Sequence, residues 1–300
     1  MSADGRFAPS PTGPLHLGSL RTALAAWLFA RSQRAGFVVR IEDLDPQRSR
    51  REFERAQLAD LCALGIDWDA PPVRQSERME LYDDALAQLH VQERLYPCFC
   101  TRAEIRDAAS APHGDLPEGA YPGTCRALSG AQRRARVAEG RPFALRVRAE
   151  RARVEFVDRL LGRRSSVVDD FVVRRADGVP AYQLAVVVDD AEQRIGEVVR
   201  GADLADSTPR QILLARLLGL PVPAYAHVPL VLGADGARLA KRHGAATLAQ
   251  RDEAPPATLA FLAHTLGLAL GRDEVGEPAE LLHEFDPERV PRDPVVVGGA

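Results

Sequence analysis

The chain has 300 residues, of which 46% are hydrophobic and 27% charged, and its formal net charge is −3. This composition is typical of a globular protein with one large domain or two smaller ones, and it excludes a disordered chain. The N-terminal stretch lacks an apolar signal core and no run reaches the roughly 18 apolar residues of a membrane helix, so we expect a cytoplasmic protein without membrane contact. Four cysteines in that compartment favour metal or thiol chemistry over disulfides.

Residues 6–19 contain three prolines and two glycines followed by an apolar helical pattern that begins near His16. The prolines keep the turn out of a helix, and Gly13 and Gly18 let the backbone come close to a ligand. Backbone N–H groups at the helix start favour an anion, and His16 adds a side-chain donor. Taken alone, the segment is more typical of a proline-rich surface turn with a solvent-exposed histidine.

The chain continues with an α/β pattern. Residues 37–41 form a β-branched run that predicts a strand, and the acidic residues 42–45 follow at its carboxyl end, where open α/β sheets bind ligands. One of these carboxylates could hold a substrate ammonium, or cap a helix. Helices are predicted over 50–64, with Cys62 on the apolar face, and over 76–95, with Met79, Tyr82, Leu86 and Leu89 on one face.

Cysteines mark an insertion of different character. Cys98 and Cys100 precede a Gly/Pro-rich loop, and Tyr121 and Cys125 follow it. Three thiolates and a phenolate would satisfy tetrahedral zinc, but free cysteines are also commonly buried as small apolar residues.

Short strands are then predicted over 143–147, 154–157 and 171–174, with a turn at Asp177 and Gly178. Apolar runs over 182–190 and 195–201 return to the α/β pattern. Arg200 lies at the end of the second run, where a cation suits a two-pronged contact with a substrate carboxylate, and Tyr182 would form the pocket wall. A strand-end arginine without a motif around it is more often structural.

Arginine clusters could give a local basic face for phosphates, although each one alone is typical of a solvated surface; they lie at residues 133–136, 146–153 and 159–164. The basic loop 236–244 includes Arg238, Ala240 and Lys241. Apolar helices are predicted over 259–268 and 278–285.

Several of these segments, in this order, resemble the class I aminoacyl-tRNA synthetases. Residues 16–19 resemble the "HIGH" signature, and their Arg-Phe-Ala-Pro-Ser-Pro-Thr-Gly lead-in resembles the glutamyl branch. Residues 238–242 resemble the second signature, "KMSKS", with Arg238 for the first lysine and Ala240 for the serine. The resemblance implies a Rossmann-like α/β catalytic fold, with a zinc-containing insertion and a small helical C-terminal region. Its parts would be residues 1–95, 96–140, 141–235 and 236–300.

The resemblance also implies roles for individual residues. His16 and Lys241 would be catalytic. The glutamate site would comprise Arg6, Ala8, Ser10, Glu42, Tyr182 and Arg200. ATP, with magnesium, would meet Pro9, His16, Gly18, Ser19 and Lys241. One structural zinc would be held by Cys98, Cys100, Tyr121 and Cys125.

Nothing after residue 243 resembles an anticodon-binding domain, so the chain is most similar to the short glutamyl-tRNA synthetase paralogues of the glutamyl-Q tRNA(Asp) synthetase family. Members activate glutamate with ATP and transfer it to queuosine in the anticodon of tRNA(Asp), and we expect a monomer. Two alternatives are a catalytic fragment that charges a tRNA 3′ end and a binding-only relative without chemistry.

Overall fold

The computed structural model describes residues 4–101, 103–105, 120–233, 235–236, 247–251 and 253–297. Most of the loop that resembles the second signature lies outside these ranges, and with it Arg238, Ala240 and Lys241. Within them, no helix has both the length and the apolar character that a membrane crossing requires.

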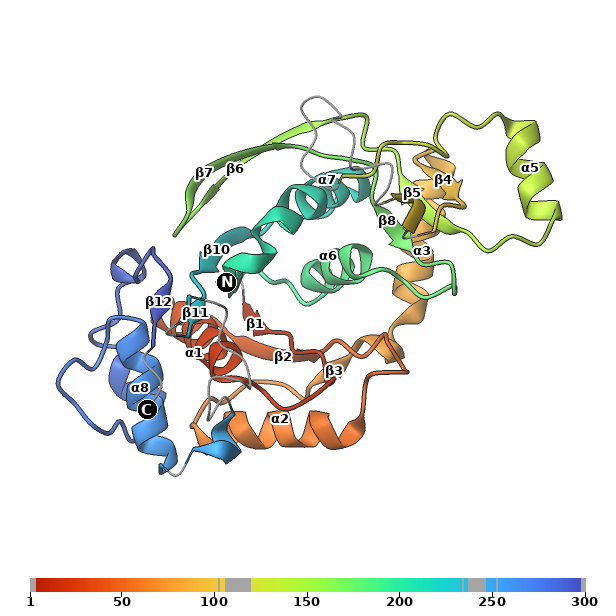
Figure 1. The fold of residues 1–300 in the computed structure, drawn as a ribbon. Helices are drawn as coiled ribbons and strands as arrows, with labels where there is room; N and C mark the ends of the chain where they lie inside the picture. Colours follow the sequence, from red (N-terminus) through yellow and green to blue (C-terminus); the bar gives the residue numbers. More distant parts are fainter. Residues whose placement is uncertain are drawn as a thin grey trace.

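The first half of the fold is a parallel β-sheet with helical crossovers (Figure 1). Strand β2 lies in the middle of this sheet and pairs in parallel with β1 on one side and β3 on the other. Its elements are β1 (Gly5–Phe7), α1 (Leu17–Ser32), β2 (Phe37–Ile41), α2 (Arg51–Ala63), β3 (Val73–Arg74) and a 3-10 turn η1 (Gln75–Glu77).

The second half contributes a sheet in the order β7-β6-β10-β9, in which β9 and β10 are parallel. Asp4, just before β1, forms a parallel bridge with Ile195, just before β9, so the two sheets meet along β1 and β9. Ligands bind at such a switch point in open α/β sheets. The elements are β6 (Arg153–Asp158), β7 (Gly162–Val167), α6 (Tyr182–Glu192), β9 (Glu197–Gly201), η2 (Ala202–Ser207), α7 (Thr208–Leu218) and β10 (Ala224–Val228).

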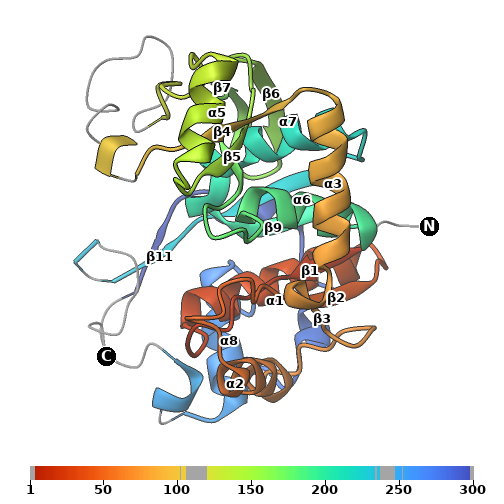
Figure 2. The same ribbon diagram turned by 90° about the vertical axis from the view of Figure 1, so that its right-hand side faces the viewer.

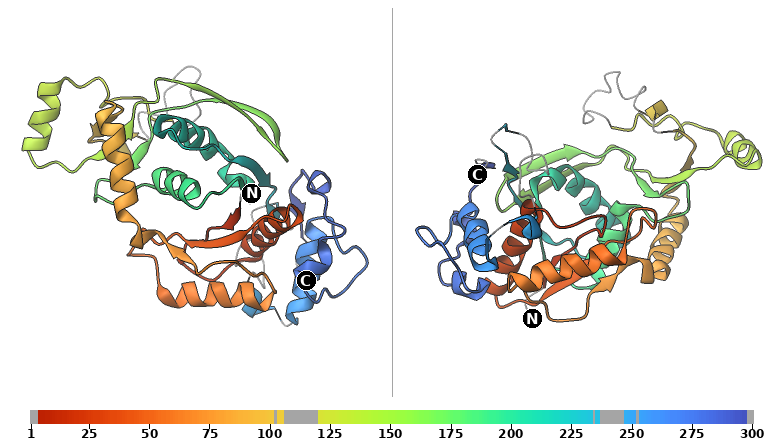
Figure 3. Two further views of the ribbon diagram at one scale, coloured as in Figure 1. Left: turned by 180° about the vertical axis from the view of Figure 1, so that it is seen from behind. Right: turned by 60° about the horizontal axis from the view of Figure 1, so that its bottom comes forward.

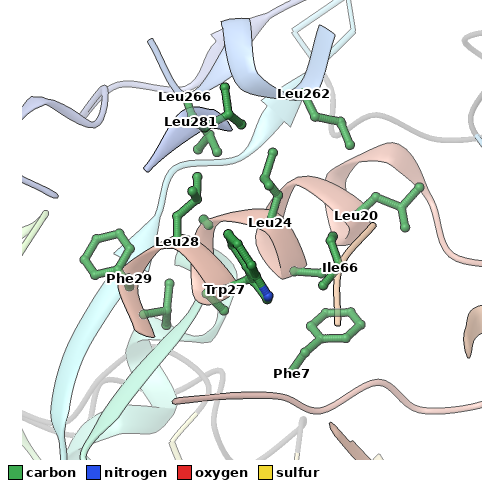
Figure 4. Close-up of a cluster of buried hydrophobic side chains, with 14 of the residues drawn as sticks. Phe7, Leu20, Leu24, Trp27, Leu28, Phe29, Ile66, Leu262, Leu266 and Leu281 are labelled. Carbon is green, nitrogen blue, oxygen red and sulfur yellow. The ribbon is translucent and has the colours of Figure 1, made fainter. Parts of the chain in front are cut away.

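Helix α1 is the centre of the main hydrophobic core (Figure 4). Leu20, Leu24 and Leu28 are fully buried, and Figure 4 shows them facing Leu262 and Leu281 of the C-terminal region. Because α1 is apolar on nearly every side, it is a core helix rather than an amphipathic surface helix. Its position, and that of the loop before it, is therefore fixed by packing from all sides.

The insertion branches from the main body after α3 (Met79–Val91), which Figure 2 shows running from β3 towards β4 and β5. A small antiparallel sheet follows, in the order β4 (Leu95–Cys98), β5 (Ala144–Val147) and β8 (Val172–Arg174). Helix α5 (Gly130–Ala138) has no buried residue and stands away from the body in both views of Figure 3. A capping box between Ser129 and Gln132 stabilises its start.

The C-terminal region packs against α1 and returns a short strand to the body. It consists of β11 (Val231–Leu232), η4 (Leu248–Gln250), α8 (Pro255–Thr265), η5 (Pro278–Leu281), η6 (Pro287–Arg289) and β12 (Val295–Val296). The helix predicted over 278–285 is wrong in length, since only one 3-10 turn forms there. Phe285 instead packs edge-on against Phe29, with ring centroids 5.3 Å apart.

Three further expectations need correction. Cys62 is exposed, not buried, because the buried stripe of α2 follows Glu54, Gln57 and Leu61 and turns away from the next residue. Met79 is 37% exposed, although the rest of the predicted face of α3 is buried. Arg146 cannot join an exposed basic face, because it is buried and donates to the Asp170 carbonyl oxygen.

Candidate active site and cysteine cluster

A cavity of about 950 Å³ opens where the two halves of the fold meet. The loop before α1, the start of α1, the ends of β2 and β9, and the segment after β10 all border it. Every described residue that the sequence predicts for glutamate or ATP lines this cavity: Arg6, Ala8, Pro9, Ser10, His16, Gly18, Ser19, Glu42, Tyr182 and Arg200.

The start of α1 forms the anion-binding side of the cavity. His16 is the N-cap, and no described side chain accepts a hydrogen bond from the first amides of the helix. The first turn also carries no acidic residue. The Nδ1 atom of His16 is buried without a partner among the described residues. The Ser19 amide donates to the His16 carbonyl oxygen at 2.8 Å, but no described side chain compensates the positive end of the helix, as an anion site requires.

Gln57 of α2 holds the proline-rich loop in place. Its Nε2 donates to the carbonyl oxygens of Ser10, at 3.0 Å, and Gly13, at 2.7 Å. The side chain is 2% exposed and lines the cavity from beneath the loop. These bonds hold the loop in the conformation in which Ser10, Thr12 and Gly13 line the cavity.

A buried charge network lies behind two of the residues that line the cavity, Arg6 and Glu42. Asp190 of α6 lies 3.3 Å from Arg6 Nε and 2.8 Å from Arg40 Nη1. Arg40 is fully buried, and its Nη2 lies 3.5 Å from Glu42 Oε1. Burial raises the pKa of Glu42, and Arg40 and Arg6 oppose that effect. Burial also disfavours the charged form of Asp190, but Arg40 and Arg6 outweigh it and lower its pKa.

Arg200 occupies the opposite wall and is held from several directions. Its Nε donates to His227 Nε2 at 3.0 Å, and its Nη2 donates to Thr208 Oγ1 at 2.7 Å and to the Leu204 carbonyl oxygen at 3.3 Å. Its Nη1 lies 3.4 Å from Tyr182 Oη. Four of its five N–H groups thus have partners within the described chain, which leaves one on Nη1. A two-pronged contact from Arg200 alone would require breaking one of these bonds.

Lys241 lies outside the described residues, but the chain on either side of it reaches the cavity. Val231, before the basic loop, lines the cavity. Thr247, after the loop, forms an antiparallel bridge with His16.

The four predicted metal ligands also converge, within the insertion. The Sγ atoms of Cys98, Cys100 and Cys125 lie within 4.8 Å of one another. Tyr121 Oη is 3.4 Å from Cys98 Sγ and 3.8 Å from Cys100 Sγ, and the ring lies against the Arg146 guanidinium at 3.7 Å. Three sulfur donors and one oxygen donor around a common centre form a set that could bind a metal.

The local environment shifts the pKa values of Cys100 and Cys125 in opposite directions. Burial, together with the hydrogen bond to Cys125, raises the pKa of Cys100 to about 12. Burial acts in the same direction on Cys125, but the Phe99 amide and neighbouring donors outweigh it and lower the pKa of that thiol. A cation at the centre would favour the ionised form of the thiols that bind it.

Sequence reasoning missed the residues that support the predicted ones. Gln57 has a recognisable signal, because a polar residue sits on the buried stripe of a helix. Asp190 and His227 do not, since each lies in an apolar run and its partner is distant in the chain.

Comparison with known proteins agrees with this geometry. The family model of tRNA synthetases class I (E and Q), catalytic domain, matches residues 3–296. The chain belongs to this family.

Individual members of the family differ in how similar they are to this chain. The chain is 58% identical over 296 residues to a glutamyl-Q tRNA(Asp) synthetase of Nocardia farcinica, covering 98% of this chain and 92% of that protein. A protein of the same name from Symbiobacterium thermophilum is 52% identical, with 97% and 94% covered. A glutamate–tRNA ligase of Geotalea uraniireducens is 42% identical, with 96% and 62% covered. A glutamate tRNA ligase structure from Elizabethkingia meningosepticum, in complex with its amino acid, has a TM-score of 0.85 at 28% identity and covers 100% of this chain and 68% of that one.

Proposed function

We propose that this protein activates L-glutamate with ATP and transfers the glutamyl group to queuosine in the anticodon of tRNA(Asp). The observation that carries the proposal is that one cavity is lined by a helix start without a side-chain cap, the partly buried carboxylate of Glu42 and the buried guanidinium of Arg200. The names of the 58% and 52% identical relatives supply the acceptor.

Glutamate has one ammonium and two carboxylates, and the cavity offers a partner for each kind of group. Glu42 meets the ammonium. Because the α-carboxylate must stay free to react, Arg200 meets the side-chain carboxylate, using the remaining N–H of Nη1 together with the Tyr182 hydroxyl. Arg6, Ala8 and Ser10 border the same volume and set its shape.

ATP lies along the loop and the start of α1, against Pro9, Gly18 and Ser19. An oxygen of the glutamate α-carboxylate attacks the α-phosphorus, the new P–O bond forms glutamyl-adenylate, and pyrophosphate leaves with the electrons of the broken bond. His16 and the first amides of α1 stabilise the negative charge that develops at the α-phosphate. Lys241 neutralises the departing pyrophosphate, and magnesium enters bound to ATP.

In the second step a hydroxyl of queuosine attacks the carbonyl carbon of the adenylate and AMP leaves, so no covalent enzyme intermediate is needed. Orientation of the two reactants is the main contribution required of the protein.

The cysteine cluster is proposed to hold one structural zinc. Cys98, Cys100, Cys125 and Tyr121 would bind it, and the ion would tie the end of β4 to the chain around Cys125. When bound, zinc supplies a fixed cross-link and no catalytic chemistry.

Glutamate-dependent exchange between ATP and labelled pyrophosphate, without tRNA, tests the first step. Exchange with glutamate and not with glutamine is the expected result. Absence of exchange would favour the binding-only alternative. A 3′-end product in the subsequent transfer assay would instead favour a tRNA-charging enzyme, such as the 42% identical ligase.

A further inference from the structure

Behind Arg200 lies a buried chain of hydrogen bonds that no step of the proposed chemistry uses. Asp158 ends β6, His227 lies on β10, and Arg200 lies beside it on β9 as its register partner. Asp158 is 1%, His227 0% and Arg200 4% exposed. His227 Nδ1 is 2.5 Å from Asp158 Oδ2, and His227 Nε2 accepts from Arg200 Nε at 3.0 Å.

The neighbours of Asp158 fix which of its oxygens faces the histidine. Oδ1 accepts from the backbone amides of Leu160 at 3.0 Å, Leu161 at 2.9 Å and His227 at 3.2 Å. Only Oδ2 is left for the imidazole. Since an ionised carboxylate can only accept, Nδ1 must carry the proton.

With the proton on Nδ1, the lone pair of Nε2 faces Arg200. Burial, with Arg200 nearby, lowers the pKa of His227 despite Asp158, so the ring stays neutral. The Thr208 hydroxyl lies 3.1 Å from Nε2 and 2.7 Å from Arg200 Nη2, which closes a ring of three side chains. The guanidinium is thereby held with Nη1 towards the cavity.

We propose that Asp158 and His227 are positioning residues that set the affinity for the glutamate side chain by fixing the tautomer that orients Arg200. The inference rests on the proposed function, because it takes Arg200 as the glutamate-binding cation. The Asp158 carboxylate orients the His227 imidazole, and the imidazole in turn orients the Arg200 guanidinium.

Asp158→Asn separates this role from simple core stability. The three backbone amides require an oxygen at the Oδ1 position, so the new NH2 group must face His227 Nδ1. The ring must then accept at Nδ1 and carry its proton on Nε2. That N–H opposes the Nε–H of Arg200, and the guanidinium loses its fixed orientation.

Pyrophosphate exchange measures the consequence in the full-length chain. Asp158→Asn is expected to raise the KM for glutamate about tenfold or more, the loss expected for a hydrogen bond to a charged group, with the KM for ATP unchanged. Asp170→Asn is the control. It alters a buried carboxylate that accepts from a backbone amide but lies in the insertion, outside the cavity, and its glutamate KM should stay at the wild-type value.

Two variants of His227 test the same inference in case Asp158→Asn does not fold. His227→Gln keeps an acceptor for Arg200 and should raise the glutamate KM less than His227→Leu, which has none. In ¹⁵N-histidine spectra, the wild-type signal of His227 should show Nδ1 protonated, and Asp158→Asn should move the proton to Nε2.

The inference is overturned if Asp158→Asn leaves the glutamate KM unchanged, if glutamate and ATP KM rise together, or if the glutamine and leucine variants are equal. Each of these outcomes presupposes glutamate-dependent exchange by the wild type. Absence of that exchange would instead overturn the proposed function, and this inference with it.

Discussion

The carboxylate of Asp190 lies 3.3 Å from the Nε of Arg6, across 184 positions of sequence, and joins the second half of the fold to the first strand. The same carboxylate contacts the fully buried Arg40 at 2.8 Å. Asp190 therefore pairs with two arginines, and Arg40 also contacts Glu42 at 3.5 Å and Asp189 at 3.7 Å. Because Arg6 and Glu42 line the cavity, Asp190 supports the residues that bind there.

Asp190→Asn should destabilise the fold by about 3–5 kcal/mol, because Arg6 loses the carboxylate with which it forms a buried ion pair and Arg40 loses the nearest of its three. Urea unfolding measures this free energy. Asp177→Asn is the control, since Asp177 pairs with Arg175 at the surface and should contribute less than about 1 kcal/mol. Equal, small effects of the two substitutions would show that Asp190 is not the support described.

Glu42→Gln should raise the KM for glutamate about ten- to a hundredfold, because a charged partner of the ammonium is lost. Asp43→Asn is the matched control: Asp43 bonds to Ser76 and is absent from the cavity lining. A glutamate KM that stays at the wild-type level in Glu42→Gln would show that another group holds the ammonium.

The same residue predicts a pH dependence. Burial raises the pKa of Glu42 above its usual 4.5. The carboxylate is ionised above the raised pKa and takes up a proton as the pH falls through it. As the pH is lowered, the KM for glutamate of the wild type should therefore begin to rise at a higher pH than it would if the pKa of Glu42 were that of an ordinary carboxyl group. Glu42→Gln should lose this rise, and an identical acid limb in both proteins would contradict the assignment.

Gln57→Leu should raise the KM for ATP about tenfold, because the Ser10 and Gly13 carbonyl oxygens lose their shared donor and the loop loses its shape. Gln88→Leu makes the same chemical change at a bond to the Leu218 carbonyl oxygen, away from the cavity. Pyrophosphate exchange at varied ATP concentration gives the KM for ATP of each variant. Equal values for Gln57→Leu and Gln88→Leu would show that Gln57 does not support the loop.

Cys125→Ser should abolish zinc binding and lower the thermal midpoint, whereas Cys62→Ser should retain one zinc per chain. Metal analysis of the purified proteins gives the stoichiometry. Glutamate-dependent exchange without tRNA should survive in Cys125→Ser, since the cluster is not part of the cavity lining. A metal-free wild type with unaltered stability would remove the structural role.

The sequence predicted residues that line the cavity, but it did not predict the residues that hold them in place. Local signals, such as a proline turn before a helix or a charge at a strand end, mark residues 6–19, Glu42 and Arg200. Such signals can be recognised in a single sequence. The dependence of Arg200 on His227 and Asp158 arises only when β6, β9 and β10 become neighbours. The predicted helix length near residue 280 was wrong for a related reason. The position of Phe285 is set by its contact with Phe29, which is distant in the sequence, and not by a helical repeat.

The attachment point of glutamate tests the central claim most directly. Labelled glutamate, ATP and the wild-type protein are incubated with tRNA(Asp) that carries queuosine and with tRNA(Asp) that lacks it, and the labelled nucleoside is identified after digestion. The account predicts label on queuosine in the first tRNA and none in the second. Equal labelling of both tRNAs, or label at the 3′ end, would contradict it.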